Sequence, residues 1–352
     1  MNLKRLVKKE VSRLRAYDAK EIPCRIKLDA NESPYGFGPA LKAAKTVLTN
    51  RYPDPDAARL KGLLSRSFGV KEANILQGNG SDELIYYLIT TFGGPVLYPV
   101  PTFSMYGIIG RALGEETVEI PLDGEFDLDE DRMLRAVRKT KPKLIFLSSP
   151  NNPTGNCFSA GKILKIIEQS RGIVVVDEAY QPFASEEGFL PLLKDYENLV
   201  IMRTLSKIGL AALRLGFMVA EAGIVAEVNK VRLPFNVNSF SQAVAAAALK
   251  DRRGLQTSLR AIVSGRDLLF EGMEKIEGVR PHPSEANFVL FAVKDADKVY
   301  RSLLKKGILV RNLDGVVKGC LRVTVGTPRE NAAFLKALAV IMSKERQIKE
   351  VA

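Results

Sequence analysis

The stretch LIFLSSPNNPTG, residues 144–155, joins a short apolar run to a turn rich in proline, asparagine and glycine. An apolar run of this length that ends at such a turn is typical of a buried strand. Similar β-branched runs recur at residues 173–177, 199–203 and 217–220, and stretches with a helical period separate them, as at 163–169. Strands that alternate with helices predict an α/β fold whose mainly parallel sheet is covered by helices on both faces.

The rest of the chain predicts a second, smaller lobe. With 352 residues, 46% of them hydrophobic and 26% charged, the chain is an ordinary globular protein of about two domains. Beyond Arg253 a long amphipathic stretch leads to shorter strand-like pieces, at 287–291, 308–311 and 321–325. We therefore expect a large domain at 41–253 and a small α+β domain at 254–352, with residues 1–40 forming an arm that contributes to the small domain.

Composition excludes several classes of function. The formal charge is +12, but lysine and arginine are mixed with acidic residues along the chain, which suits small anionic substrates better than nucleic acid. Three dispersed cysteines and a single histidine, His282, exclude structural zinc and a histidine-based catalytic triad, so we expect no metal. We also expect a cytoplasmic protein without membrane contact, because no apolar run approaches membrane-spanning length and the basic start has no secretory core.

Two residues at predicted strand ends indicate the chemistry. In open α/β sheets, ligands bind at the carboxyl ends of the strands. Asp177 ends one strand, where a buried carboxylate without a cationic partner is costly, and Lys207 follows the next strand in the segment TLSK, residues 204–207. A carboxylate bound to a protonated pyridine nitrogen, beside a lysine that forms a Schiff base, is the arrangement that pyridoxal 5'-phosphate requires. Taken alone, however, Lys207 is better explained as a solvated loop residue, and it is Asp177 beside it that favours the cofactor.

Further residues fit the same cofactor. Asn152 and Tyr180 are candidates to bind its phenolic oxygen, although the turn at 149–155 on its own is only a connecting loop. The segment QGNGSDE, residues 77–83, opens a helix but lacks the third glycine of a dinucleotide fingerprint. A helix N-terminus binds phosphate through its free N–H groups, so we assign the cofactor phosphate to Gly80, Ser81, Asp82, Ser206 and Arg214, and we expect Thr204 to be a further cofactor-binding residue.

Blocks along nearly the whole chain resemble one enzyme family. LDANESPYG at 28–36, RYPD at 51–54 and LRVTVGT at 321–327 are similar to the histidinol-phosphate aminotransferases, which are fold-type I pyridoxal-phosphate enzymes. The resemblance implies that Lys207 carries the cofactor, that Asp177 pairs with its ring nitrogen and that Phe103 stacks on the ring. It further implies that Tyr52 reaches the cofactor phosphate of the partner subunit in a homodimer with shared active sites.

The substrate side also rests on the resemblance. It implies that Arg322 binds the substrate carboxylate, with Arg311, Asn31, Tyr17 and Tyr106 as further candidates that are equally well structural. The implied reaction is transamination between L-histidinol phosphate and 2-oxoglutarate, giving imidazole acetol phosphate and glutamate for L-histidine biosynthesis. An aromatic aminotransferase or a threonine-phosphate decarboxylase on the same fold is the alternative, and a non-enzymatic regulator is the alternative from another class.

The chain departs from the family pattern at two places. Phe103 stands where the family usually has tyrosine, but stacking needs only an aromatic face. Ile208 follows the lysine where a small residue is usual, and Arg214 comes seven positions after the lysine where the family has eight. The loop is one residue short, which leaves the phosphate contacts of Arg214 open.

Overall fold

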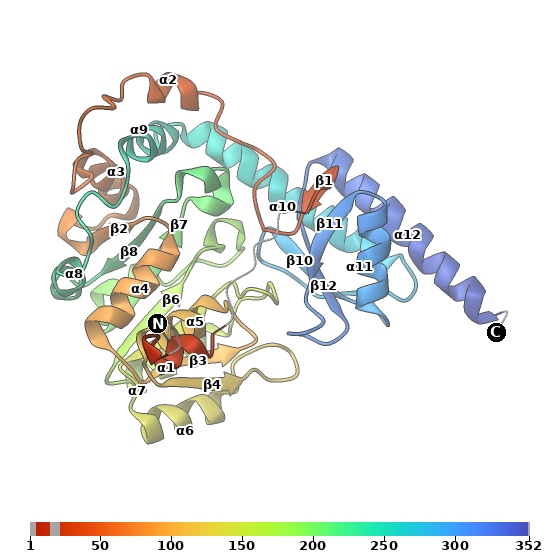
Figure 1. The fold of residues 1–352 in the computed structure, drawn as a ribbon, viewed down its shortest axis with the longest axis horizontal. Coiled ribbons are helices and arrows are strands. Elements are labelled where there is room, and N and C mark those ends of the chain that lie inside the picture. The colour runs from red at the N-terminus through yellow and green to blue at the C-terminus, as the bar shows by residue number, and fades with distance from the viewer. Residues whose placement is uncertain (1–4, 15–21, 351–352) are drawn as a thin grey trace.

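A large and a small lobe lie side by side in the computed structural model, each built around its own sheet (Figure 1). The structure describes residues 5–14 and 22–350, except for the side chains of 345–350. The large lobe holds seven strands in the order β2-β8-β7-β6-β5-β3-β4. They are β2 (Ile75–Gly78), β3 (Val96–Val100), β4 (Thr117–Pro121), β5 (Leu144–Ser148), β6 (Ile173–Asp177), β7 (Leu199–Thr204) and β8 (Gly216–Ala220).

All neighbours in this sheet are parallel except β8, which runs antiparallel to both β2 and β7. The reason lies in the connection from β7 to β8, which holds only two single-turn 3-10 helices, η5 (Ser206–Ile208) and η6 (Ala211–Leu213). A parallel return needs a crossover of a dozen or more residues, usually a helix. The mainly parallel mixed sheet predicted from the sequence is thus confirmed.

Helices cover both faces of the large sheet, as expected. Residues of β5 show the two faces: Leu144 and Phe146 pack in one apolar cluster, and Ile145 and Leu147 pack in another. Because successive side chains of a strand point to opposite faces, the whole of β5 is buried. The helices are α2 (Ala40–Ala44), α3 (Ala58–Phe68), α4 (Ser81–Phe92), α5 (Met105–Leu113), α6 (Glu130–Thr140), α7 (Ala160–Gln169), α8 (Ala222–Asn229) and α9 (Ser239–Ala248), with short η2 (Glu72–Asn74), η3 (Gln181–Phe183) and η4 (Leu190–Lys194) between.

The small lobe contains a five-stranded sheet in the order β1-β11-β12-β10-β9. Its strands are β1 (Ile26–Leu28), β9 (Arg280–Pro281), β10 (Phe288–Ala292), β11 (Ile308–Asn312) and β12 (Cys320–Thr324), with helices α10 (Arg252–Glu274), α11 (Ala296–Lys305) and α12 (Pro328–Glu350). β1 pairs in parallel with β11, so an N-terminal segment completes the sheet of the C-terminal lobe (Figure 1). The domain boundaries at residues 40 and 253 remain predictions, and the second falls at the start of α10.

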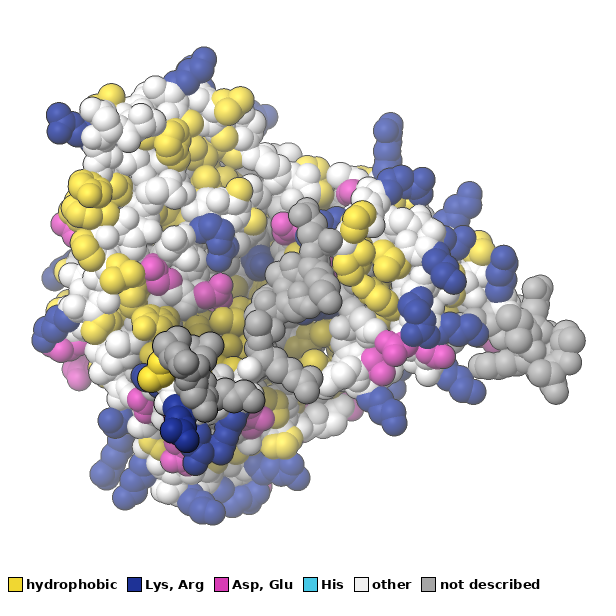
Figure 2. Space-filling view, in the orientation of Figure 1, with side chains coloured by type: hydrophobic (Ala, Val, Ile, Leu, Met, Phe, Trp, Pro, Cys, Tyr) yellow, Lys and Arg dark blue, Asp and Glu magenta, His cyan; other side chains and the backbone are white. Residues whose placement is uncertain are grey.

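Backbone and side-chain contacts join the lobes beside the carboxyl ends of the large sheet. The N–H of Glu285 donates to the carbonyl of Gly155 at 2.7 Å, and Arg266 donates to the carbonyl of Phe183 at 3.1 Å. Lysine and arginine side chains gather on the lower edge of the large lobe and on the outer side of the small lobe (Figure 2). Among the described residues, no helix combines the length and the apolar character that crossing a bilayer requires.

Candidate active site

Three neighbouring parallel strands bring the predicted catalytic residues to one edge of the large sheet. Asn152 follows β5, Asp177 ends β6 and Lys207 follows β7. The register pairs Ser148 with Asp177 and Asp177 with Met202, so the three strands end at the same level. This edge is where open α/β sheets bind their ligands.

Asp177 is a buried carboxylate held by two hydrogen bonds. Its Oδ2 accepts from the hydroxyl of Tyr106 at 2.7 Å, and its Oδ1 accepts from the backbone N–H of Ala179 at 3.1 Å. Burial raises the pKa of Asp177 to about 6, although both hydrogen bonds oppose that rise. Among the described residues no lysine or arginine forms an ion pair with Asp177, so the side chain fits a ligand that brings its own positive charge, such as a protonated pyridine nitrogen.

Tyr106 lies beneath this carboxylate rather than on the substrate side, where the resemblance had placed it. Its ring is completely buried and stacks on Phe146 with centroids 4.7 Å apart and planes at 11°. Burial, followed by the charge of Asp177, raises the pKa of Tyr106 well above its ordinary value, so the hydroxyl stays protonated and donates. Phe103 is half-buried and meets the ring of Tyr106 edge-on, with centroids 5.6 Å apart.

Lys207 and Tyr180 lie close to one another at the same edge. The Nζ of Lys207 is 5.8 Å from the centroid of the Tyr180 ring, and Lys207 itself is half-buried. The hydroxyl oxygen of Tyr180 accepts a hydrogen bond from the Nδ2 of Asn31 at 2.9 Å. Asn31, predicted on the substrate side, therefore already uses its amide group within the protein.

The predicted phosphate site is assembled at the N-terminus of α4. Gly80 precedes the helix with φ +86° and leaves its first N–H groups without a side-chain cap. The guanidinium of Arg214 lies over Gly80, so closely that a Cβ on Gly80 would lie 2.7 Å from Nη2. A free helix N-terminus facing an arginine fits a phosphate group.

The short loop after Lys207 still delivers Arg214 to this site. The loop folds as η6, and Arg214 then adopts a left-handed conformation with φ 49°. Its Nη2 lies 3.5 Å from Asp82 and its Nη1 lies 3.5 Å from the Ser206 hydroxyl. The hydroxyl of Thr204 donates to Ser206 and accepts the Ser206 N–H, so Thr204 braces this turn. The Asp82 carboxylate would repel a phosphate, which leaves its backbone N–H as the binding group.

Arg322 is buried and reaches across the lobes to Asn152. Its guanidinium donates to the Oδ1 of Asn152 in a short contact and to the carbonyl of Asp29 at 2.8 Å. It also lies 5.1 Å from the centroid of the Phe288 ring. Because the oxygen of Asn152 accepts from arginine, its Nδ2 is the part of the amide that can donate to a ligand.

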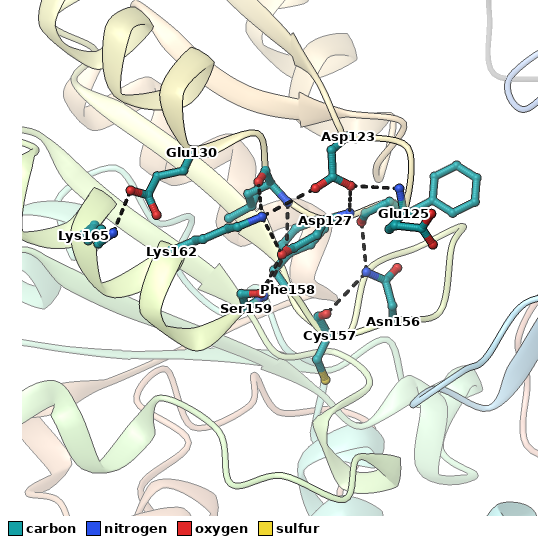
Figure 3. A network of polar contacts seen from close by, with 12 residues as sticks. Asp123, Glu125, Asp127, Glu130, Asn156, Cys157, Phe158, Ser159, Lys162 and Lys165 are labelled. Atoms are coloured by element: carbon teal, nitrogen blue, oxygen red, sulfur yellow. Dashed lines mark hydrogen bonds and ion pairs between the residues drawn. The ribbon is translucent and has the colours of Figure 1, made fainter.

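A polar network holds the loop that carries Asn152 (Figure 3). Lys162 forms an ion pair of 2.8 Å with Asp127, and both the N–H and the hydroxyl of Ser159 donate to the same carboxylate. Burial raises the pKa of Asp127, but the bonds from Lys162 and Ser159 outweigh it and leave that pKa below its ordinary value. Asn156 donates to the carbonyl of Phe126 at 2.9 Å, so the segment after Asn152 is tied to the turn before α6.

The remaining candidates are spread more widely. Arg311 is exposed and lies directly opposite Arg322 on the antiparallel partner strand. Tyr52 is 82% exposed, and its ring stacks on that of Phe235 with centroids 4.7 Å apart. Tyr17 lies outside the described residues.

Three functional contacts were missed from the sequence: Tyr106 on Asp177, Asn31 on Tyr180, and Asn151, whose amide joins Pro101, Thr102 and Thr154. For the contact made by Asn31, the sequence does carry a signal. Arg322 and Thr324 alternate along β12 and so share a face, and Thr324 is the residue that anchors Asn31.

Comparisons with known proteins agree with this geometry. The family model for aminotransferase class I and II matches residues 23–338. A histidinol-phosphate aminotransferase of Aquifex aeolicus is 46% identical over 347 residues, covering 95% of this chain and 97% of that protein. Histidinol-phosphate aminotransferase 2 of Nitrosococcus oceani is 43% identical, with 94% of this chain and 96% of that protein covered.

A solved structure carries the cofactor. The histidinol-phosphate aminotransferase of Sinorhizobium meliloti in complex with pyridoxal-5'-phosphate superposes with a TM-score of 0.87 at 25% identity, covering 96% of this chain and 98% of that one. With the fit of the sheet edge described above, the cofactor of this chain is pyridoxal phosphate. The chain therefore belongs to the class I and II aminotransferases and, within them, to the histidinol-phosphate aminotransferase family.

Proposed function

We propose that this aminotransferase exchanges the amino group of L-histidinol phosphate with 2-oxoglutarate, in L-histidine biosynthesis. The observation that carries the choice of substrate is the pairing of Arg311 with Arg322 on adjacent strands beside Asn152. Like charges directly opposite one another in a sheet are destabilising, and an anion between them removes that cost. A planar guanidinium binds carboxylate and phosphate equally well, so one site serves both glutamate and a phosphate monoester.

The cofactor, when bound, supplies an electron sink for charge that develops at the substrate α-carbon. Asp177 would pair with the protonated ring nitrogen, and Asn152 and Tyr180 would donate hydrogen bonds to the phenolic oxygen. Lys207 would hold the cofactor covalently and would serve as the general base toward the proton on the substrate α-carbon. Phe103 would pack on the ring, while Arg214, Ser206 and the N–H groups of α4 would hold the phosphate.

A second part of the proposal is a homodimer in which Tyr52 serves the phosphate site of the partner. Support comes from exposed apolar side chains around Tyr52, since contiguous apolar patches mark interfaces. Tyr52 stacks on Phe235, and Arg232 donates to the carbonyl of Pro55, so these segments form one surface. The exposed members are Leu41, Leu48, Tyr52, Leu233, Phe235 and Phe240.

Mixing two inactive variants tests the shared site. In a hybrid of Lys207→Ala and Tyr52→Ala subunits, one active site regains both residues only if Tyr52 acts across the interface. We expect the mixture, after subunit exchange, to exceed the summed activity of its parents. Activity equal to that sum would refute sharing, and a monomeric mass in light scattering would refute the dimer.

The substrate is tested by measuring glutamate formed from L-histidinol phosphate and 2-oxoglutarate, beside phenylalanine as the amino donor. Strong preference for histidinol phosphate supports the proposal. Preference for phenylalanine would make the protein an aromatic aminotransferase. Carbon dioxide released from threonine phosphate without a keto acid would make it a decarboxylase. A cytoplasmic location belongs to the same proposal, and cell fractionation tests it.

A further inference from the structure

Asn31 is a buried residue whose polar groups are all engaged with the protein. Its backbone N–H donates to the hydroxyl of Thr324 at 2.9 Å, and its carbonyl accepts from the Nδ2 of Asn287 at 3.0 Å. Its Oδ1 accepts from Thr324 at 3.3 Å, and its Nδ2 donates to the hydroxyl of Tyr180 at 2.9 Å. This leaves Asn31 ill suited to bind substrate directly, so its place beside the active site has another explanation.

The backbone at Asn31 restricts which residues fit. Its φ is 55°, a left-handed conformation in which asparagine is among the few residues other than glycine found regularly. Side-chain shape and hydrogen-bonding type can therefore be varied separately here. Glycine keeps the backbone and removes the amide, while aspartate keeps the shape and replaces the donor with an acceptor.

The bond to Tyr180 fixes the direction in which the tyrosine donates. An amide nitrogen can only donate, so the Tyr180 oxygen must act as acceptor toward Asn31. The hydroxyl proton of Tyr180 is then directed away from Asn31. A phenol that accepts one hydrogen bond is polarised and becomes a better donor in its other bond.

The anchor of this contact belongs to the small lobe, whereas Tyr180 belongs to the large one. Thr324 lies on β12 and Asn287 directly precedes β10, while Tyr180 follows β6. The Tyr180 ring also packs edge-on against Phe288 of the small lobe, with centroids 5.2 Å apart. The small lobe thus determines both where the ring lies and which way its hydroxyl points.

We propose that Asn31 is a positioning residue that makes Tyr180 a hydrogen-bond donor to the cofactor's phenolic oxygen and so lowers the proton affinity of the bound cofactor. The inference rests on the proposed placement of Tyr180 and adds the residue that controls its polarity. The charged groups beside Tyr180 are Lys207 of η5, whose Nζ lies over the Tyr180 ring, and Arg322, which shares Phe288 with Tyr180, while Asp177 at the end of β6 is three residues before Tyr180. All three stay unchanged in the variants below.

The test is the pH midpoint of the visible absorption change of the cofactor-loaded protein. A hydrogen bond to a charged oxygen is worth about 1.5–3 kcal/mol, so its loss raises a pKa by about one to two units. We expect Asn31→Asp to raise the midpoint by about that much, because the carboxylate both turns the Tyr180 proton toward itself and adds negative charge. Asn31→Gly, which adds no charge, should give a smaller rise.

A double-mutant cycle with Tyr180→Phe separates this inference from the proposed function. If Tyr180→Phe alone leaves the midpoint unchanged, the placement of Tyr180 is wrong. If Tyr180→Phe raises the midpoint but Asn31→Gly does not, the placement stands and our inference is overturned. If each single variant raises the midpoint, Asn31→Gly should cause no further rise in the Tyr180→Phe background, because the two residues act on the cofactor through one hydrogen bond. An equal added shift there would also overturn the inference.

A matched control and a milder variant complete the design. Asn198 donates to three carbonyls, of Ile167, Ser170 and Gly172, far from the sheet edge. Asn198→Asp should lower the melting temperature without moving the midpoint, so a shift there would count against our reading. If the Asn31 variants do not fold, Thr324→Val removes the hydroxyl that holds Asn31, and an unchanged midpoint in that variant contradicts the inference.

Discussion

The two halves of the active site are built in different ways. The cofactor half comes from successive strand ends of one sheet, within residues 152–214, and from the start of α4. The substrate half draws on Arg311 and Arg322 of the small lobe, far along the chain from the cofactor residues, and Arg322 reaches Asn152 across the lobes. We propose that the partner's Tyr52 joins the cofactor half, at the phosphate. The comparison teaches that a site made at the edge of a single parallel sheet is a local product of the sequence, whereas a site between lobes depends on how distant segments meet.

Lys207→Ala should break the cofactor half most severely. Loss of the covalent link and of the general base together should lower turnover by about 10⁴-fold or more, because base catalysis alone supplies about 10²–10⁴-fold. Lys230→Ala is the matched control, since Lys230 is exposed at the end of α8 and forms an ion pair there with Glu227. Turnover that survives in the Lys207 variant, measured as glutamate formed, would remove the basis of the mechanism.

Asp177→Asn should lower turnover by about 10²–10³-fold, the usual cost of losing one preorganised electrostatic contact. The same change should stabilise the protein without cofactor. Asp177 has a raised pKa of about 6, so the folded state binds its proton more tightly than the unfolded chain, and stability falls as pH rises from about 4 to 6. A pKa difference of about two units between the folded and unfolded states corresponds to about 3 kcal/mol in the free energy of unfolding. The variant should therefore melt at a higher temperature than the wild type at pH 8 and lose that advantage towards pH 4.

The control for this prediction is Asp127, a carboxylate whose pKa is shifted in the opposite direction. Asp127 has a lowered pKa, so its stabilising effect is present above its unfolded pKa and is lost only on acidification below that value. Asp127→Asn should therefore melt at a lower temperature than wild type at both pH 8 and pH 5. Equal behaviour of the two variants across that range would show that burial of Asp177 carries no such cost.

Arg322→Lys should affect the substrate half, with a smaller effect. Lysine keeps the charge but cannot hold Asn152, the Asp29 carbonyl and a bound carboxylate at once. We expect kcat/KM to fall by about 10–100-fold, chiefly through KM, with cofactor binding retained. Loss of bound cofactor in this variant, judged from its visible spectrum, would mean that the two halves are not separable.

Arg311→Ala should have the smallest effect. Arg311 is exposed, so its contribution to anion binding is screened by solvent and salt. We expect KM for histidinol phosphate to rise by a few-fold at low salt and the difference to shrink at high salt. A loss as large as that of Arg322→Lys would show that Arg311 is a principal ligand.

The strand ends that carry the proposed cofactor half were predicted correctly because their sequence signals are local. Apolar runs that end shortly before Asn152, at Asp177 and shortly before Lys207 predicted three strand ends, and the glycine before α4 indicated where that helix begins. The position of Arg214 could not be predicted, because it depends on the left-handed turn that closes the short loop. Tyr106 was misplaced, since only the packing of α5 on β5 shows that its hydroxyl points at Asp177.

The alternation along β12 bears on where the chain tolerates added residues. Arg322 and Thr324 reach Asn152 and Asn31 from the same face of one strand. One residue inserted within Cys320–Thr324 would turn the following side chains to the other face and disconnect both contacts. Insertions at the exposed residues near Val316, in the hairpin before β12, only lengthen a loop. Lineages of this enzyme should therefore vary in length in that hairpin and keep β12 constant, and a peptide tag is best placed there.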